Sequence, residues 1–264
     1  MTSRVTFRDK IAGESMFLLW RLSVFVALGM ASIACAPPAP ATPTPSSPIP
    51  TSIVDLFAAR RQQMVADQIR VRNVTDAGVL RAMETVPRHE FVPLEFLDQA
   101  YEDHPLPIGS GQTISQPYIV AVMTELAQIK RGDHVLEIGT GSGYQAAILS
   151  VLTDQVYSIE ILPELAESAG ARLKRLGYTN VIVKNADGYN GWEEHAPFDA
   201  ILVTAAPDHI PPPLIAQLKD GGRMIIPVGP VGFFQTLWRV NKRDDKIVSE
   251  NIMGVAFVPL TRGR

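Results

Sequence analysis

Short apolar runs alternate with segments of helical periodicity in the second half of the chain, and this alternation limits the possible folds more than any other feature. The apolar runs lie at residues 135–138, 156–159, 181–184, 200–203 and 224–226, and the predicted helices lie at 144–152, 163–176 and 212–218. The run at 200–203 has no polar alternation, as expected of a central strand covered on both faces. Strands separated by helices predict a doubly wound, mostly parallel sheet, in which ligands bind outside the carboxyl ends of the strands.

The end of the chain departs from this alternation. Two further strands are predicted at 237–240 and 254–260 with no helix between them, so we expect an antiparallel edge. The expected fold is of the α/β class, a doubly wound, mostly parallel sheet of seven strands with helices on both faces.

The segment before the sheet is predicted to add helices. Residues 53–86 carry apolar groups at helical spacing, which predicts two short N-terminal helices with Thr75 or Asp76 capping the second. Residues 87–116 are rich in Pro, Gly, His and Asp and are expected to form a structured loop. Pro117 suits the first turn of a further helix, which is predicted to run to about Ile129.

The first residues are typical of an export signal. Basic residues precede a largely apolar stretch at 16–34 that ends in small residues, which predicts a secretory signal peptide. Cys35, the only cysteine, follows at once, as in bacterial lipoprotein signals, although Ser32 stands where such signals usually carry leucine. We expect residues 1–35 to be a signal peptide or lipoprotein-like leader, with translation starting at the first residue or at Met16, and Cys35 to be a candidate membrane tether through lipidation.

Composition separates this leader from the folded part. Residues 36–52 are rich in Pro, Ala, Thr and Ser and carry no charge, so we expect an extended linker before a domain at 53–264. A single cysteine argues against a disulfide framework and against a metal site of several thiolates. The formal net charge of −3 argues against nucleic acid as a partner. We expect a monomer.

The strongest local signal is the run Glu137-Ile138-Gly139-Thr140-Gly141-Ser142-Gly143, which follows the apolar run at 135–138. Alternate glycines let the backbone turn sharply and bring its N–H groups close to a ligand. The dinucleotide pattern G-x-G-x-x-G does not fit, because Tyr144 stands at its third glycine. The run resembles the first motif of class I S-adenosylmethionine-dependent methyltransferases. The resemblance implies that this run binds the cofactor, and its candidate residues are Glu137, Gly139, Thr140, Gly141, Ser142 and Gly143.

Acidic residues follow the next two predicted strands. Glu160 ends the second strand, at a spacing from the glycine loop that suits hydrogen bonds from both ribose hydroxyls of a nucleotide-like ligand. Asp187 and Gly188 follow the third strand, where enzymes of the resembled class contact adenine. The alternative for Asp187-Gly188 is a plain turn.

Four further stretches narrow the resemblance to one family. They are VPRHEFVP at 86–93, LPIGSGQTISQP at 106–117, FDAILVTAAP at 198–207 and FVPL at 257–260. Together with the glycine loop they closely resemble protein-L-isoaspartate O-methyltransferases over about residues 55–264. The run at 111–117 is the most specific, because general methyltransferases lack it. The resemblance implies a Rossmann-like methyltransferase fold, S-adenosyl-L-methionine as methyl donor and no metal.

The resemblance also implies a reaction. The methyl group goes to the free α-carboxylate of an L-isoaspartyl residue in a damaged protein or peptide, and the ester then closes to a succinimide whose hydrolysis restores some normal aspartate. The residue carried over as catalytic is Ser115, whose hydroxyl would hold the acceptor carboxylate in line. Ser115 has an alternative role as the cap of the helix that Pro117 begins. The candidates for substrate binding are Thr113, Ile114, Gln116, Val258, Pro259 and Leu260.

Two other functions fit the same sequence: a methyltransferase for another carboxylate acceptor, and a non-catalytic exported binding protein. The chain also departs from many relatives at Ala186, where they have glycine, and at Ala256, where several have a basic residue. The second departure leaves open how the substrate backbone is held. The family is typically cytoplasmic, whereas the leader of this chain predicts export to the periplasm or a lipid-anchored form.

Overall fold

The computed structural model of the protein describes residues 53–230 and 234–263. The predicted leader, Cys35 and the predicted linker lie outside these residues, so they remain predictions. Among the described helices, none combines the length and the apolar character that a membrane crossing requires.

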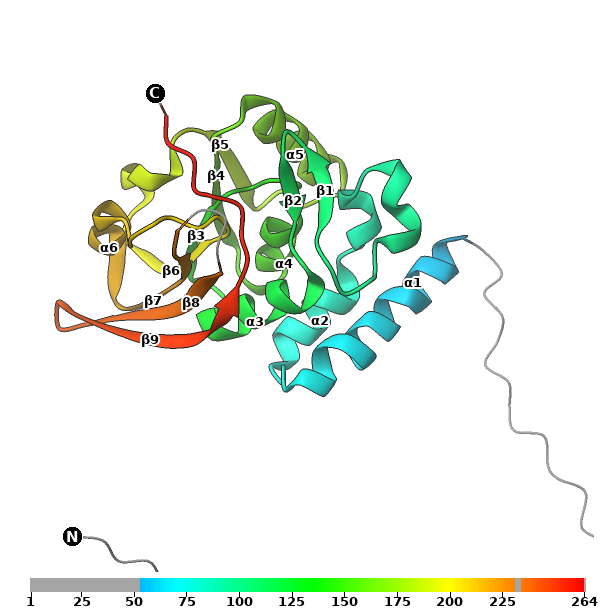
Figure 1. The fold of residues 1–264 in the computed structure, drawn as a ribbon, viewed down its shortest axis with the longest axis horizontal. Coiled ribbons are helices and arrows are strands. Elements are labelled where there is room, and N and C mark those ends of the chain that lie inside the picture. Colours follow the sequence, from blue (N-terminus) through cyan, green and yellow to red (C-terminus); the bar gives the residue numbers. More distant parts are fainter. Residues whose placement is uncertain (1–52, 231–233, 264) are drawn as a thin grey trace, which may run out of the picture. The chain divides into compact units, whose positions relative to one another are not determined.

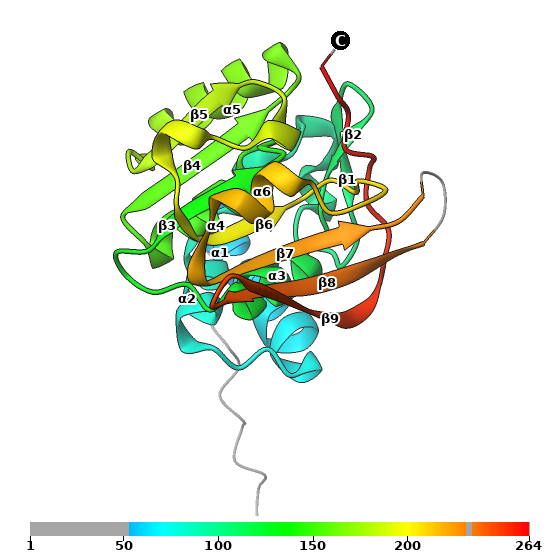
Figure 2. The same cartoon turned by 90° about the vertical axis from the view of Figure 1, so that its left-hand side faces the viewer.

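Seven strands form one sheet in the spatial order β5-β4-β3-β6-β7-β8-β9 (Figures 1 and 2). Strands β3 to β7 run parallel, and β8 and β9 each pair antiparallel with the strand before them. The strands are β3 (His134–Ile138), β4 (Gln155–Glu160), β5 (Val181–Asn185), β6 (Phe198–Val203), β7 (Leu218–Val228), β8 (Gln235–Arg243) and β9 (Lys246–Val255). The predicted doubly wound, mostly parallel sheet with an antiparallel edge is confirmed.

Helices cover both faces of this sheet. Val135 and Ala200 point to the face covered by α3 and α4, whereas Leu136 and Ile201 point to the face covered by α6 and Trp192. Helix α5 packs against α4 through Leu173. The helices that flank the sheet are α3 (Pro117–Ala127), α4 (Tyr144–Leu152), α5 (Pro163–Arg175) and α6 (Pro212–Gln217).

Two N-terminal helices, α1 (Ile53–Met64) and α2 (Ala77–Thr85), pack outside this layer. Asp76 caps α2, because its side chain accepts a hydrogen bond of 2.9 Å from the amide of Val79. This decides between Thr75 and Asp76 as the cap and confirms the two predicted helices.

The predicted structured loop contains a small hairpin, made of β1 (Leu106–Gly109) and β2 (Gln112–Ile114). Ser110, at the tip of the hairpin, donates a hydrogen bond of 2.9 Å from its Oγ to the carboxylate of Glu164 in the first turn of α5. The side chain of Ile108 lies 3.3 Å from where a Cβ on Gly141 would stand. The hairpin therefore covers the glycine loop.

The strand predicted at 254–260 is misplaced: only residues 254–255 belong to the last strand, and Pro259 forms an isolated bridge with Ala206. The last strand, β9, ends at Val255, and the chain then leaves the sheet and runs past the β1–β2 hairpin (red in Figures 1 and 2). The amide of Ala206 donates to the Val258 carbonyl at 2.8 Å, and the amide of Leu260 donates to the Ala206 carbonyl at 2.9 Å. These apolar residues thus pair with the segment after β6, and β9 itself gives no apolar signal because most of its side chains are exposed.

Candidate active site

The inner pocket lies at the carboxyl ends of β3, β4 and β6, where the strand order reverses direction. Its volume, including the open mouth, is about 860 Å³. The structure brings most of the predicted residues to its wall: Thr113, Ile114, Ser115, Gly139, Thr140, Gly141, Ser142, Glu160, Gly188, Val258, Pro259 and Leu260. Of the substrate candidates, Gln116 lies outside this pocket.

The glycine loop turns where only glycine is tolerated. Gly139 has φ +100°, and a Cβ there would lie 2.5 Å from Thr204 Oγ1. The Thr204 hydroxyl in turn lies 2.8 Å from each of the carbonyl oxygens of Ile138 and Gly139. Thr204 follows β6 and was missed as a site residue, since only the sheet pairing of β3 with β6 brings it to the loop.

Glu160 joins the loop to the end of the second strand. Its carboxylate accepts hydrogen bonds from the amides of Gly141, at 2.8 Å, and Leu162, at 3.0 Å. The side chain is buried but lines the inner pocket. Because each carboxylate oxygen can accept more than one hydrogen bond, Glu160 retains acceptor capacity for a ligand.

Glu137 does not reach the pocket. Its side chain is fully buried, and it accepts a hydrogen bond of 2.5 Å from Ser158, whose hydroxyl lies 2.6 Å from that of Thr140. Oε1 of Glu137 is buried with no partner among the described residues. Burial raises the pKa of this carboxyl to about 8, with a smaller contribution from the charge of Glu160. Glu137 therefore supports the glycine loop from below, through two hydroxyl groups.

Gly143 and Asp187 are also not among the residues that line the inner pocket. Gly143 has φ +89° and stands directly before α4, against Leu173. Asp187 accepts hydrogen bonds of 3.0 Å from the amides of Tyr189 and Gly263 and from Arg262 Nε. Partial burial alone would raise the pKa of Asp187, but these hydrogen bonds outweigh it and hold the pKa below its usual value.

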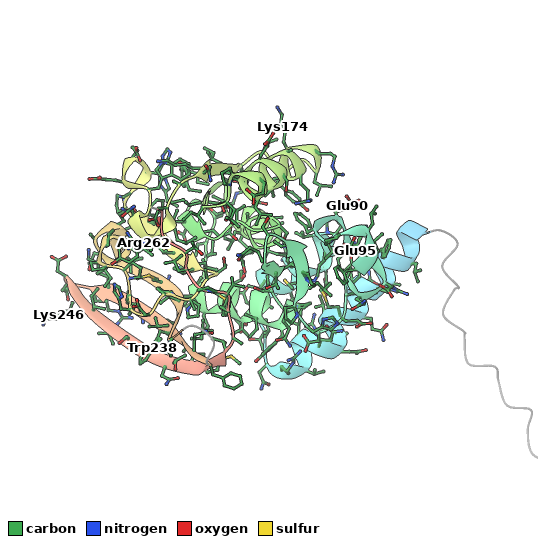
Figure 3. All side chains as sticks on the ribbon, turned by 45° about the horizontal axis from the view of Figure 1, so that its top comes forward. Glu90, Glu95, Lys174, Trp238, Lys246 and Arg262 are labelled. Atoms are coloured by element: carbon green, nitrogen blue, oxygen red, sulfur yellow. The ribbon has the colours of Figure 1, made fainter. Side chains whose placement is uncertain are left out.

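Arg262 extends this contact. Its guanidinium carbon lies 3.6 Å above the centre of the Tyr189 ring, and Figure 3 labels the side chain. The carboxyl-terminal residues thus clasp the turn that carries Asp187 and Gly188. A plain turn at Asp187-Gly188 accounts for the hydrogen bond from the Tyr189 amide. The other two hydrogen bonds of Asp187 come from Arg262 and Gly263.

Ser115 lies between β2 and α3 with its hydroxyl free of partners among the described residues. Helix α3 is capped at Gln116 without a side-chain hydrogen bond, so the alternative role of Ser115 as a cap is wrong. The backbone carbonyl of Ser115 accepts a hydrogen bond of 2.8 Å from the side chain of Arg88. Arg88 is fully buried and also donates to the Ala100 carbonyl at 2.8 Å. Burial lowers the pKa of Arg88 to about 10. Arg88 was missed as a site residue, because nothing local in the sequence pairs it with Ser115.

A second hollow, here called the outer cavity, opens beside the inner pocket with a volume of about 1240 Å³. Four residues line both: Thr113, Ser115, Thr204 and Val258. One wall comes from Arg72 and the segment from Thr113 to Ile119, and the other from the segment from Met253 to Val258. Gln116 lies here. The two hollows therefore meet at Ser115.

The residues that line the inner pocket suit a nucleoside. They combine a carboxylate, hydroxyls and glycine backbone with apolar walls from Ile138 and Ile159. Within the described residues, no group of three or more His, Cys, Asp or Glu side chains is placed to hold a metal ion. The glycine loop and Glu160 lie at the carboxyl ends of a doubly wound sheet that finishes in an antiparallel hairpin. Together these features define a class I S-adenosylmethionine-dependent methyltransferase.

Comparisons with known proteins specify the family. A family model described as "Protein-L-isoaspartate(D-aspartate) O-methyltransferase (PCMT)" matches residues 59–264. The chain is 58% identical over 202 residues to "Protein-L-isoaspartate O-methyltransferase" of Opitutus terrae, covering 76% of this chain and 87% of the relative. It is 60% identical over 190 residues to "Protein-L-isoaspartate O-methyltransferase 2" of Polaromonas sp., covering 72% and 90%. The chain belongs to the protein-L-isoaspartate(D-aspartate) O-methyltransferase family.

Solved structures agree with this assignment. One titled as a protein-L-isoaspartate O-methyltransferase superposes with a TM-score of 0.68 at 32% identity, covering 75% of this chain and 65% of that one. A protein from Plasmodium falciparum, solved in complex with S-adenosyl-L-homocysteine, shares the fold with a TM-score of 0.67 at 24% identity, covering 77% of this chain and 99% of that one.

Proposed function

We propose that the chain transfers a methyl group from S-adenosyl-L-methionine to the free α-carboxylate of L-isoaspartyl residues in damaged proteins and peptides, and so initiates their repair. The junction of the two hollows carries the proposal, because Ser115 and Thr204 line both. A cofactor in the inner pocket and a peptide in the outer cavity would meet beside the Ser115 hydroxyl. Membership of the family supports the same activity.

We assign the inner pocket to the cofactor, which supplies an activated methyl group on a cationic sulfonium. Glu160 would accept hydrogen bonds from the ribose hydroxyls while it keeps the amides of Gly141 and Leu162. Gly139 and Gly141 let the backbone approach the ligand closely, and Gly188 forms the rim after β5. Of the predicted cofactor-binding residues, those that line the pocket are Gly139, Thr140, Gly141, Ser142, Glu160 and Gly188. Glu137, Gly143 and Asp187 do not line it and would instead support the loops that do.

Ser115 performs the alignment of the acceptor. A carboxylate is ionised at neutral pH, so the reaction needs no general base, and catalysis reduces to orientation and removal of water. The Ser115 hydroxyl would donate to one carboxylate oxygen and leave the other free to take the methyl group, while the bond between the methyl group and the sulfonium breaks and S-adenosyl-L-homocysteine leaves. The apolar segment at Val258, Pro259 and Leu260 excludes water from the junction, and Thr113, Ile114 and Gln116 form the wall beside it.

One assay tests this function. The full chain is incubated with S-adenosyl-L-methionine labelled on the methyl group, and with an isoaspartyl peptide or its normal aspartyl twin. Base-labile label on the isoaspartyl peptide alone is the expected result. Label on neither peptide overturns the proposal. Label on other carboxylates instead would identify a methyltransferase with a different acceptor.

We also propose that the leader is used. Residues 1–35 would direct export, and lipid attached to Cys35 would tether the domain to a membrane through the linker at 36–52. The leader's basic start, apolar centre and small residues before Cys35 support this. Cell fractionation should find the full chain outside the cytoplasm, and labelled palmitate should enter the wild type but not Cys35→Ser. A cytoplasmic, unlabelled chain would contradict both.

A further inference from the structure

The outer cavity contains one charged side chain among its described lining residues, Arg72. The rest of the lining is apolar or neutral, with aromatic rings from Tyr118, Phe234 and Phe257. Ala256 on the facing wall presents only a methyl group. Among the described lining side chains, Arg72 is therefore the only charged hydrogen-bond donor for a peptide in this cavity, beside neutral donors such as Thr113, Ser115, Gln116, Tyr118 and Thr204.

The guanidinium of Arg72 is fixed on two sides. Its Nε donates to the Gln68 carbonyl at 2.6 Å, and its Nη2 pairs with the carboxylate of Asp103. Its carbon lies 3.9 Å above the centre of the Tyr118 ring. Among the described residues, Nη1 has no partner, and the side chain is 35% exposed. The group is thus preorganised, with one edge left to donate to a ligand.

The charge around Arg72 favours a neutral ligand group. Asp103 neutralises the guanidinium and also accepts a hydrogen bond of 2.8 Å from Gln116, the neighbour of Ser115. A second carboxylate would be repelled by Asp103, whereas an amide carbonyl would not, because it carries no net charge. The Gln116–Asp103 contact also ties the position of Arg72 to that of Ser115.

We propose that Arg72 binds a main-chain carbonyl oxygen of the substrate peptide, beside the isoaspartyl residue whose carboxylate meets Ser115. This proposal rests on the function proposed above and deepens it. The outer cavity then takes an extended peptide whose flanking residues are neutral or apolar, and an acidic residue at the flank that faces Asp103 weakens binding.

Steady-state kinetics of the full chain tests the assignment. The substrates are an isoaspartyl hexapeptide and a series in which each flanking amide in turn is replaced by an E-alkene, which removes one carbonyl and keeps the backbone geometry. We expect Arg72→Ala to raise the KM of the parent peptide about tenfold or more, with kcat little changed. One E-alkene peptide should raise the KM of the wild type similarly and have no further effect on Arg72→Ala. Arg72→Lys should be intermediate, because it keeps the charge and loses the fixed fork.

Arg70→Ala is the matched control. Arg70 lies two residues away, is largely exposed and pairs with Glu84 outside the cavity. Its loss should leave KM unchanged. The affinity of each variant for S-adenosyl-L-homocysteine reports on folding, and it should match that of the wild type.

Three results would overturn the inference. The KM of Arg72→Ala stays at the wild-type value, or its affinity for S-adenosyl-L-homocysteine falls with its activity, or the penalty of every E-alkene peptide persists in the variant. In each case the wild type still methylates the parent peptide, so the proposed function stands. If the wild type methylates no isoaspartyl peptide, the proposed function itself has failed.

Discussion

At the scale of single residues, the role proposed for Ser115 predicts a loss of turnover without a loss of cofactor binding. The Ser115 hydroxyl is free of partners among the described residues, while Arg88 fixes the backbone at this residue. Loss of a hydrogen bond to a charged group costs about 1.5–3 kcal/mol, so Ser115→Ala should lower kcat about tenfold or more and leave the affinity for S-adenosyl-L-homocysteine unchanged. Kinetics with an isoaspartyl peptide and titration calorimetry measure the two quantities. Ser249→Ala, on exposed β9, is the control, and an equal loss in both quantities would contradict the role of Ser115.

Glu160 should show the opposite pattern. A glutamine keeps one acceptor oxygen but turns the other into a donor that faces the amide of Gly141 or Leu162. Glu160→Gln should therefore weaken S-adenosyl-L-homocysteine binding about tenfold or more, as measured by calorimetry. Glu167→Gln, on the exposed face of α5, should bind as the wild type does. Wild-type affinity in Glu160→Gln would show that the carboxylate does not touch the ribose.

Glu137 gives stability a pH dependence of unusual sign. Its pKa is about 8 in the fold and 4.5 for an ordinary glutamate, so folding takes up a proton between these values. The free energy of unfolding therefore falls as pH rises through this window, by up to about 1.4 kcal/mol per pH unit from this group. Urea unfolding of the protein without cofactor should show a smaller fall between pH 5 and pH 8 in Glu137→Gln than in the wild type or in Glu167→Gln. Equal slopes would mean that Glu137 is ionised in the fold.

Residues next to a sequence signal could be predicted to lie at the site, and residues brought in from elsewhere could not. The glycine loop and Glu160 stand at the ends of recognisable strands. Arg88 and Thr204 reach the site through contacts with Ser115 and Gly139, which lie 27 and 65 residues away along the chain. Asp187 was expected at the ligand, but its partners in the tail, Arg262 and Gly263, have no signal of their own.

At the scale of elements, the β1–β2 hairpin stands apart from the main sheet and is anchored in the core by Leu106 and Ile114. A two-stranded hairpin alone is marginally stable, and this one is fastened to α5 by the exposed contact of Ser110 with Glu164. Its amides at 106–114 should exchange with deuterium much faster than those of β3 and β6, and should slow when S-adenosyl-L-homocysteine fills the pocket beneath. Hydrogen exchange with mass spectrometry measures this. Exchange that the ligand does not alter would show that the hairpin does not cover the cofactor.

The elements also show what limits prediction from sequence. Helices that begin at a proline, such as α3, α5 and α6, were placed within two residues at either end, because proline and glycine mark the boundaries locally. Strand β7 extends well before its predicted apolar centre, and β9 was misplaced. The parts of both strands that were not predicted carry mostly exposed or polar residues. These residues adopt strand structure because they pair with a neighbouring strand, and the sequence has no local signal for that pairing.

At the scale of the whole molecule, every described contact of the site involves residues from Gln68 to Gly263. A chain that begins at residue 53 should therefore unfold at the same temperature as the full chain, within a few degrees, and methylate an isoaspartyl peptide with the same kcat/KM. Calorimetry and steady-state kinetics compare the two. A large loss of activity in the shorter chain would assign a part in catalysis to the predicted leader or linker.

The clasp on Asp187 has a practical consequence for handling the protein. The amide of Gly263 and the side chain of Arg262 hold the turn beside the inner pocket, one residue before the last position of the sequence. An affinity tag or reporter fused directly after Arg264 would begin one residue from Gly263 and would compete with this contact for space. Purification handles and fluorescent labels are therefore better attached elsewhere, and methylation rates measured on carboxyl-terminal fusions should be compared with those of the untagged chain.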